Sequence, residues 1–410
     1  MYTPSFEDLV GNQQDFFSQY FNQKPMYRPR SIPVDPRQII SIAELDELLH
    51  YQAIRRPYLR LAKSGVLVLP ESYTRTQRIQ GEMLTDAVTP SNVYEHFRAG
   101  ASITWPTMNH YRPNLRQLCS DLGTRFSSRS EAVAFLTPAG QQGFNPHYDP
   151  GDLFIIQVEG SKHWKLWMPP EIRKDDSRQY KLEDLAEPVF EANLEPGDVL
   201  YLPYNTPHVA AALDSMSLHL TFQIAPRMWS TLLVRVVREL VDNDPDFWIY
   251  PYMNESALDA RSEDLKRILG LLTDKLAKLD TAREVEFLIN VGQVDGGTAP
   301  TGTVFQELMS IDRMGGDTLL ARKPSIKVSL GDSTDGRTQV KISGMALQSE
   351  SARAAAETTL KLPDPIAMTL QRMDAGSCIR ADELYPTADS RRSVEAAKTL
   401  ARIGILTPLS

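Results

Sequence analysis

Residues 145–152 read Asn-Pro-His-Tyr-Asp-Pro-Gly-Asp, and an apolar run, Leu-Phe-Ile-Ile-Gln-Val, follows at 153–158. The run is short and ends at a Glu-Gly pair, which is the pattern of a buried strand bounded by a turn. Side chains alternate between the two faces of an extended segment, so His147 and Asp149 should project from the same face. The stretch therefore predicts a strand that presents an imidazole and a carboxylate side by side.

Short strands separated by turn residues continue on both sides of this stretch, over residues 131–225. The turn at 195–198, Glu-Pro-Gly-Asp, joins two of them, because proline and glycine supply the fixed and the positive φ of a tight turn. Strands this closely spaced favour a double-sheet jelly roll. We therefore expect an α+β protein with a central double-stranded β-helix, whose strands cover 132–136, 152–158, 162–167, 189–194, 199–202, 209–213 and 218–224.

Helical segments flank the strands, and the 410 residues exceed what one hydrophobic core usually organises. Amphipathic pieces precede the strands, and the helical period at 231–241 and 262–279 follows them. The C-terminal part mixes strand-like and helical segments. We predict three domains: a jelly roll with an N-terminal helical buttress at 1–225, a helical domain at 226–320, and a C-terminal domain at 321–410.

Composition narrows the class of protein. A net charge of −8 argues against a chain that coats nucleic acid, so we expect no nucleic-acid partner. Cys119 and Cys378 are the only cysteines, too few for a disulfide framework, which favours a reducing compartment. The first residues lack a basic start with an apolar core, and no apolar run approaches the roughly 18 residues that span a bilayer. We expect a cytoplasmic protein without membrane association.

His208 ends the segment Pro-Tyr-Asn-Thr-Pro-His at 203–208 and is the third candidate ligand. Two histidines and one carboxylate form the set that leaves coordination positions open on non-haem Fe(II). The simpler explanation for His147 and Asp149 is an Asx-type turn before the Pro-Gly pair. Asp152 is the rival carboxylate, but its odd offset from His147 should turn it to the other face. The pattern favours an iron oxygenase.

Oxygen activation at such a centre needs a two-electron co-substrate, and 2-oxoglutarate requires a cation for its distal carboxylate with a hydroxyl nearby. Lys162 begins the strand after the His-x-Asp strand, and Thr221 lies on the strand after His208. Each could instead be solvated or structural. His219 shares the face of Thr221, so we interpret it as a lining or core residue, whereas His163 alternates away from Lys162.

Three segments together resemble a known family. They are residues 137–149, Thr-Pro-Ala-Gly-Gln-Gln-Gly-Phe-Asn-Pro-His-Tyr-Asp; residues 154–164, Phe-Ile-Ile-Gln-Val-Glu-Gly-Ser-Lys-His-Trp; and residues 195–203, Glu-Pro-Gly-Asp-Val-Leu-Tyr-Leu-Pro, which lead to His208. The sequence resembles the JmjC-type, cupin-like 2-oxoglutarate oxygenases, and within them the ribosomal oxygenase group. The resemblance implies an enzyme that uses Fe(II), 2-oxoglutarate and O2, with iron bound by His147, Asp149 and His208.

The same resemblance implies that Lys162 pairs with the distal carboxylate of 2-oxoglutarate, assisted by Thr221. Phe135 and Gln223 would lie on the substrate side. One departure is Val133, which stands where some relatives carry a polar co-substrate-contacting residue. Family members include a bacterial arginine hydroxylase and a human histidine hydroxylase, and they typically act on a ribosomal protein. We therefore expect a protein or peptide substrate, with succinate and CO2 as co-products.

The resemblance also implies that the helical domain at 226–320 mediates homodimerisation and that 321–410 form a winged-helix domain. Alternatives remain open. The same chemistry could serve a biosynthetic peptide or a free amino acid, and lysine demethylation is a weaker alternative. A winged-helix DNA-binding regulator is disfavoured, because residues 322–410 hold 13 Lys and Arg against 10 acidic residues without a basic recognition stripe. A metal-binding cupin that does not use 2-oxoglutarate is similarly disfavoured.

Overall fold

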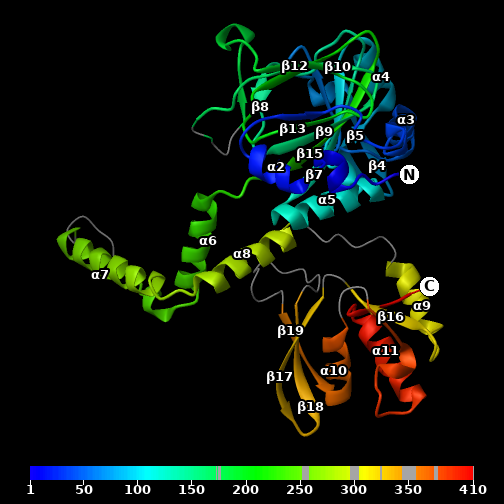
Figure 1. Ribbon diagram of the computed structural model, residues 1–410. Helices are drawn as coiled ribbons and strands as arrows, with labels where there is room; N and C mark the ends of the chain where they lie inside the picture. The colour runs from blue at the N-terminus through cyan, green and yellow to red at the C-terminus, as the bar shows by residue number, and fades with distance from the viewer. Residues whose placement is uncertain are drawn as a thin grey trace. The chain divides into compact units, whose positions relative to one another are not determined.

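The computed structural model describes residues 1–171, 173, 177–251, 258–295, 304–323, 326–343, 357–373 and 377–409. They form two compact units, 1–297 and 298–410 (Figure 1). The N-terminal unit holds two facing β-sheets with helices around them. None of the helices described is both long enough and apolar enough to cross a lipid bilayer.

Two antiparallel sheets make up the jelly roll. Each strand predicted between 132 and 224 is present, with its ends shifted by no more than two residues. The eight-stranded sheet runs, in spatial order, β1 (Met26–Arg28), β13 (Val199–Leu202), β9 (Asp152–Glu159), β15 (Ser217–Ile224), β7 (Ser130–Thr137), β6 (Ser102–Trp105), β2 (Arg60–Lys63) and β3 (Val66–Leu67). The five-stranded sheet runs β11 (Arg178–Gln179), β8 (His147–Tyr148), β14 (His208–Ala212), β10 (Lys162–Leu166) and β12 (Phe190–Leu194).

The eight-stranded sheet is buried on both faces, which explains why β9 reads as a continuous apolar run instead of alternating. Phe154 and Ile156 belong to the large core on its outer face, while Leu153 and Ile155 point into the smaller core between the two sheets. Every residue of β9 except its last is buried. The inner core, to which Trp164 also belongs, is the layer that contains the site described below.

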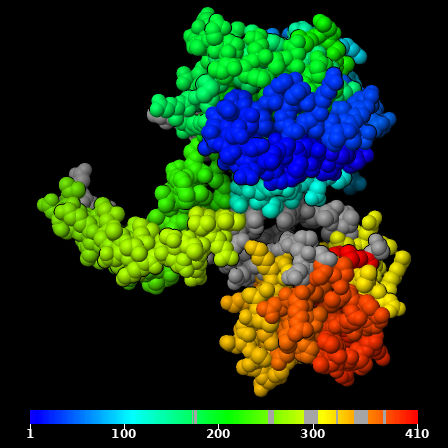
Figure 2. Space-filling view, viewed as in Figure 1, coloured from blue at the N-terminus to red at the C-terminus, as the bar shows by residue number. Residues whose placement is uncertain are grey.

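Helices from the N-terminal segment pack against the outer face of the eight-stranded sheet. In Figure 2 the N-terminal residues, in blue, lie across the front of the jelly-roll unit, between its green and cyan parts. Phe6 of α1 (Phe6–Val10) is fully buried, with its ring 6.1 Å from that of Phe154. A capping box starts α3 (Ile42–Tyr51): Ser41 Oγ accepts from the Glu44 amide, and the Glu44 carboxylate accepts from the Ser41 amide.

Several elements of the N-terminal unit were not predicted. They are α5 (Pro113–Phe126) and the hairpin of β4 (Thr74–Ile79) and β5 (Glu82–Val88). The hairpin is mostly polar and exposed, so it lacks the apolar alternation from which strands are recognised. The amphipathic pieces expected before the strands include α2 (Gln13–Gln19) and α4 (Pro90–Arg98), which are helical in the structure.

After the jelly roll come α6 (Trp229–Asp242), α7 (Leu258–Leu276) and α8 (Thr281–Asp295). None of the described side chains of α6 and α7 is buried, although α6 is rich in leucine and valine and α7 is rich in leucine. Leu265 and Leu269 of α7 are 59% and 52% exposed, and Trp229 of α6 is 68% exposed. These helices therefore present apolar side chains that the described part of the chain does not cover.

The C-terminal unit has its own core of apolar side chains, including Leu320, Val340 and Leu370. Two three-stranded sheets and three helices surround it. The winged-helix assignment stays a prediction. In chain order the elements are α9 (Val304–Asp312), β16 (Leu319–Arg322), β17 (Lys327–Thr334), β18 (Arg337–Ser343), β19 (Glu357–Pro363), α10 (Asp364–Arg372), β20 (Cys378–Arg380), α11 (Ser390–Arg402) and β21 (Leu406–Pro408).

Candidate metal centre

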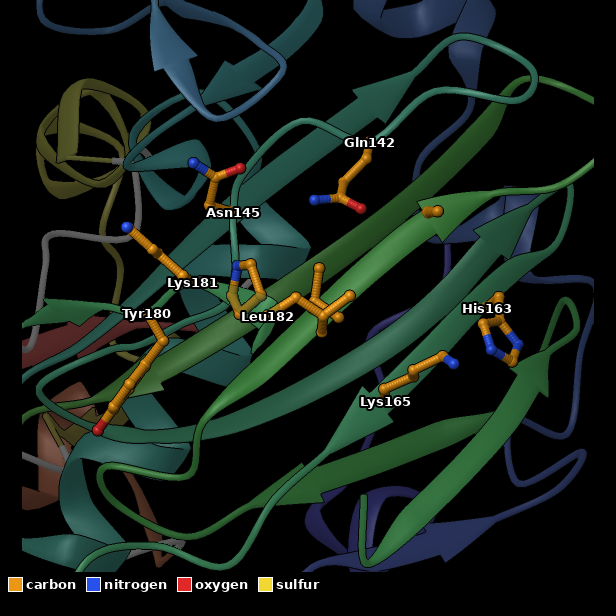
Figure 3. Close-up of a pocket in the computed structure, with 10 residues that line it drawn as sticks. Gln142, Asn145, His163, Lys165, Tyr180, Lys181 and Leu182 are labelled. Atoms are coloured by element: carbon orange, nitrogen blue, oxygen red, sulfur yellow. The ribbon is translucent and has the colours of Figure 1, made fainter. Parts of the chain in front are cut away.

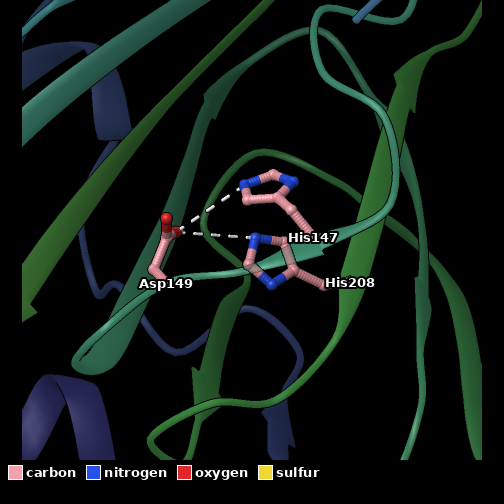
Figure 4. Close-up of side chains that lie close together, drawn as sticks. All are labelled: His147, Asp149 and His208. Atoms are coloured by element: carbon pink, nitrogen blue, oxygen red, sulfur yellow. Dashed lines mark ion pairs between the residues drawn. The ribbon is translucent and has the colours of Figure 1, made fainter. Parts of the chain in front are cut away.

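His147, Asp149 and His208 converge at one end of the five-stranded sheet (Figure 4). Nε2 of His147 and Nε2 of His208 each lie 3.8 Å from Oδ2 of Asp149. One ligand atom from each of the three residues falls within 4.8 Å of the other two. This is the spacing at which three donor atoms can share one metal ion.

Strand pairing explains the position of the two histidines. His208 is the register partner of His147 where β14 pairs with β8, so the two rings are cross-strand neighbours on one face. β8 ends at Tyr148, so Asp149 lies one residue beyond the strand, directly before the bend at Pro150. The predicted juxtaposition of His147 and Asp149 is present.

Both imidazoles are oriented by backbone carbonyls. Nδ1 of His147 lies 2.8 Å from the carbonyl oxygen of Asn145, and Nδ1 of His208 lies 2.9 Å from that of Thr206. A proton on each Nδ1 satisfies these hydrogen bonds and leaves the Nε2 lone pair directed at the cluster. Burial lowers the pKa of His208 to about 4, which keeps its ring neutral, as a metal ligand must be.

The donor set fits Fe(II). Two neutral imidazole nitrogens and one carboxylate oxygen form the facial set used by non-haem iron oxygenases, and it leaves positions free for small ligands. His208 is buried, while His147 and Asp149 are partly exposed, so the cluster has one protected side and one open side. Two paired strands and the residue that follows one of them thus supply the three candidate ligands.

Asp152, the rival carboxylate, faces away from the cluster as predicted. It is buried against Tyr201, whose hydroxyl donates a hydrogen bond to Asp152 Oδ1. Burial raises the pKa of Asp152 to about 6. The hydroxyl oxygen of Tyr201 in turn accepts from the Asn22 amide at 3.1 Å, so this pair ties the N-terminal segment to the eight-stranded sheet.

Lys162 lies on the inner face of β10, in the same inter-sheet layer as His208. Its ammonium nitrogen is 3.0 Å from Oγ1 of Thr137 and 3.3 Å from Nδ1 of His219. Burial lowers the pKa of Lys162 to about 7, because desolvation disfavours the charged form. A buried amine with only neutral partners in the described part of the chain is suited to receive an anionic ligand.

Thr221 and His219 lie one pleat apart on the same face of β15, as predicted. Thr221 is buried, but the hydrogen bonds that Lys162 makes among the described residues go to Thr137 and His219. The sequence predicted a lining or core position for His219 and indicated no role for Thr137. The only signal for Thr137 was its place at the end of a predicted strand, and its partner could be recognised only from the sheet register.

Phe135 and Gln223, the predicted substrate-side residues, both border this layer. The Phe135 ring stacks on His219 with centroids 4.8 Å apart and planes 6° apart. Gln223 packs closely on Gly151: a Cβ placed on that glycine would lie 2.9 Å from Cγ of Gln223. Phe135 is therefore near the Lys162 end of the layer, and Gln223 is near the loop that holds Asp149.

A separate pocket of about 390 Å³ lies on the opposite face of the five-stranded sheet (Figure 3). His163 and Lys165 of β10 line it, and these residues alternate with Lys162 and Trp164, which face the inter-sheet layer. His163 is hydrogen-bonded to Asn193 and Glu191 on that outer surface, which confirms that it turns away from Lys162. This pocket is therefore distinct from the metal centre.

The jelly roll and the candidate ligand set together are similar to those of cupin-like metal-dependent oxygenases. Residues 107–232 match the model of the JmjC domain. The chain is 30% identical over 290 residues to a protein of Dictyostelium discoideum named bifunctional lysine-specific demethylase and histidyl-hydroxylase NO66, covering 65% of this chain and 54% of that protein. It is also 30% identical over 243 residues to ribosomal oxygenase 1 of Danio rerio, covering 57% of this chain and 42% of that protein.

Solved structures show the same fold. The Escherichia coli protein YcfD superposes with a TM-score of 0.52 at 17% identity, covering 98% of this chain and 99% of that chain. A second structure, described as YcfD, a ribosomal oxygenase, in complex with cobalt and 2-oxoglutarate, has a TM-score of 0.51 at 17% identity and the same coverage. Residues 107–232 are thus similar to a JmjC domain, and the chain is similar in sequence to proteins that include a ribosomal oxygenase. It spans about half or less of the length of the curated relatives named above.

Proposed function

We propose that this protein is an Fe(II)- and 2-oxoglutarate-dependent dioxygenase that hydroxylates an arginine or histidine side chain of a ribosomal protein, with succinate and CO2 as co-products. One observation carries the proposal: the His147, Asp149 and His208 cluster shares an inter-sheet layer with a buried lysine that has no anionic partner in the described part of the chain. A metal and a dicarboxylate are the ligands that this pair of features accepts.

The proposed metal-binding residues lie at one end of the inter-sheet layer, and the proposed 2-oxoglutarate-binding residues lie at the other. His147, Asp149 and His208 would hold Fe(II), and Lys162 would bind the distal carboxylate of 2-oxoglutarate, with Thr221 nearby. Fe(II) with 2-oxoglutarate and O2 supplies an oxidant able to take a hydrogen atom from an aliphatic C–H bond. The apolar walls around Lys162, including the ring of Trp164, exclude water that would otherwise quench such a species.

The proposed class of substrate is inferred from the names of the similar proteins. One of them is named a histidyl-hydroxylase and another a ribosomal oxygenase, which supports a ribosomal protein side chain as the target. Phe135 and Gln223 would contact that side chain at the two borders of the layer. Lysine demethylation is a second candidate, because the same relative is named a lysine-specific demethylase. Both reactions would begin with hydroxylation of a carbon atom.

The decisive experiment uses the full chain with Fe(II), 2-oxoglutarate and O2, and peptides from ribosomal proteins or methylated lysine peptides. We expect a peptide mass gain of one oxygen atom on arginine or histidine, with one succinate formed per hydroxylation. Loss of a methyl group would favour the demethylase instead. Lys162→Ala should raise the 2-oxoglutarate concentration needed for turnover, because the bound carboxylate loses its cation. Absence of succinate formation with any substrate would refute the dioxygenase proposal.

We also propose that the protein is a cytoplasmic homodimer. The apolar side chains exposed on α6 and α7 support dimerisation through the helical segment that follows the jelly roll, because large exposed apolar surfaces usually mark interaction sites. The C-terminal segment would act as a winged-helix accessory domain.

A further inference from the structure

The indole N–H of Trp164 is a buried donor without an acceptor. The side chain is 3% exposed, and its Nε1 has no hydrogen-bond partner among the described residues. Buried polar groups are nearly always hydrogen-bonded, since leaving one unsatisfied costs about 1–3 kcal/mol. A donor of this kind inside a proposed ligand cavity therefore points to a ligand atom that satisfies it.

Trp164 lies in the inter-sheet layer, near both the candidate metal cluster and Lys162. Its ring centroid is 5.9 Å from that of His208, a candidate metal ligand, and 5.4 Å from that of His219. His219 in turn lies 3.3 Å from the Lys162 ammonium nitrogen. Along β10, Lys162 and Trp164 share the inner face because they are two residues apart. A molecule that extends from the cluster to Lys162 would therefore lie close to the indole.

The chemistry of 2-oxoglutarate matches this position. Between pH 6 and 8 it offers only acceptors, namely two carboxylates and a ketone oxygen, so every polar contact that it makes with the protein needs a donor. Lys162 supplies one donor at the distal end. The other polar side chains on the inner faces of β10 and β15 are those of Ser217, His219, Thr221 and Gln223.

We propose that the indole N–H of Trp164 donates a hydrogen bond to an oxygen of bound 2-oxoglutarate, which makes Trp164 a co-substrate-binding residue in addition to Lys162. This inference rests on the proposed function, because it names a further contact of the same site. The apolar surroundings of Trp164 alone would imply only that its ring excludes water. The proposal adds a direct hydrogen bond to the co-substrate.

Trp105 provides a matched control. Its indole nitrogen is also buried and lacks a partner among the described residues, and the side chain is 1% exposed. Trp105 is paired with Ala134, and both belong to the core on the outer face of the eight-stranded sheet, away from the inter-sheet layer. Trp105→Phe and Trp164→Phe thus remove the same atom from two equally buried indoles, only one of which faces the proposed ligand.

The test measures binding of 2-oxoglutarate to the full chain loaded with Zn(II), a redox-inert and diamagnetic substitute for Fe(II). We expect Trp164→Phe to weaken binding about tenfold in calorimetry, the effect of losing one hydrogen bond to a charged group. Trp105→Phe should bind 2-oxoglutarate as tightly as the wild type does.

Nuclear magnetic resonance gives a second measurement. In the wild type, the indole N–H resonance of Trp164 should shift when 2-oxoglutarate is added, while that of Trp105 should not. The chain has five tryptophans. If Trp164→Phe does not fold, substituting each of the other four in turn still assigns the Trp164 resonance by elimination.

Four outcomes would overturn the inference. Unchanged affinity in Trp164→Phe would show that the indole makes no contact, and so would a Trp164 resonance that does not respond to the ligand. An equal loss of affinity in both variants would show a general packing effect instead of a hydrogen bond. If Zn(II)-loaded wild type does not bind 2-oxoglutarate at all, the proposed function fails together with the inference, whereas the other three outcomes leave the proposed function standing.

Discussion

The ammonium nitrogen of Lys162 lies 3.3 Å from Nδ1 of His219, deep between the two sheets of the jelly roll. Burial lowers the pKa of both groups, that of His219 well below its ordinary value, so the imidazole is neutral and accepts a hydrogen bond from the lysine. Thr137 is the other acceptor, at 3.0 Å. The lysine is thus held in place by neutral partners, and its third hydrogen is left to donate to a ligand.

Binding of 2-oxoglutarate should take up a proton through Lys162. The pKa of this lysine is about 7 in the free protein, so above pH 7 it is mostly neutral there. A bound carboxylate favours the charged form and raises the pKa, so close to one proton should be absorbed per ligand at about pH 8.5, and affinity should fall as pH rises above 7. Calorimetry in buffers of different ionisation enthalpy measures this uptake, and Lys162→Met should abolish it. A binding enthalpy independent of the buffer would contradict the prediction.

Replacement of His219 should impair co-substrate binding more than chemistry. His219→Leu removes the acceptor that fixes Lys162 but keeps an apolar side chain of similar bulk, so we expect KM for 2-oxoglutarate to rise about tenfold with kcat little changed. His219→Asn places an oxygen acceptor close to the position of Nδ1 and should restore most of the affinity. Steady-state succinate formation measures both constants. Equal behaviour of the two variants would indicate that His219 acts only through packing.

Asp149 and Asp152 form a matched pair for testing the ligand assignment. Loss of a residue that only supports a metal ligand lowers metal affinity roughly 10- to 100-fold. Asp149→Asn should lower it by more than that, because a ligand itself is lost, and the variant should not turn over 2-oxoglutarate. Asp152→Asn should keep metal binding, because Asp152 is bonded to Tyr201 on the other face. Metal content after dialysis and CO2 release report the two effects. Tight metal binding by the Asp149 variant would remove that residue from the ligand set.

Charges on α7 should disrupt the proposed dimer. Leu265 and Leu269 lie one helical turn apart and are each more than half exposed. Leu265→Asp combined with Leu269→Asp would place two carboxylates in an apolar interface, where desolvation is unfavourable. Light scattering should give a dimer mass for the wild type and half of that for the double variant, with unchanged circular dichroism. A monomeric wild type would refute the proposal.

The fold of the jelly roll could be predicted closely because its strands are bounded by strong turn signals. Examples are the Pro-Gly turn at 195–198 and the Glu-Gly pair that follows β9. The β4–β5 hairpin could not be predicted, since its side chains are largely exposed and polar and leave no apolar period. The helix α5 was missed as well, although it buries Leu115 and Leu118 against the sheet.

The sequence by itself was enough to predict that His147, Asp149 and His208 lie together, because local spacing and flanking prolines bring them to strand ends, and it also singled out Lys162. Tertiary structure alone decided what surrounds the lysine. Thr137, Trp164 and His219 come from three different strands, and they meet only through the register of those strands and the packing of the two sheets. A shift of one residue would turn each of these side chains to the other face, and no local pattern in the chain specifies that register.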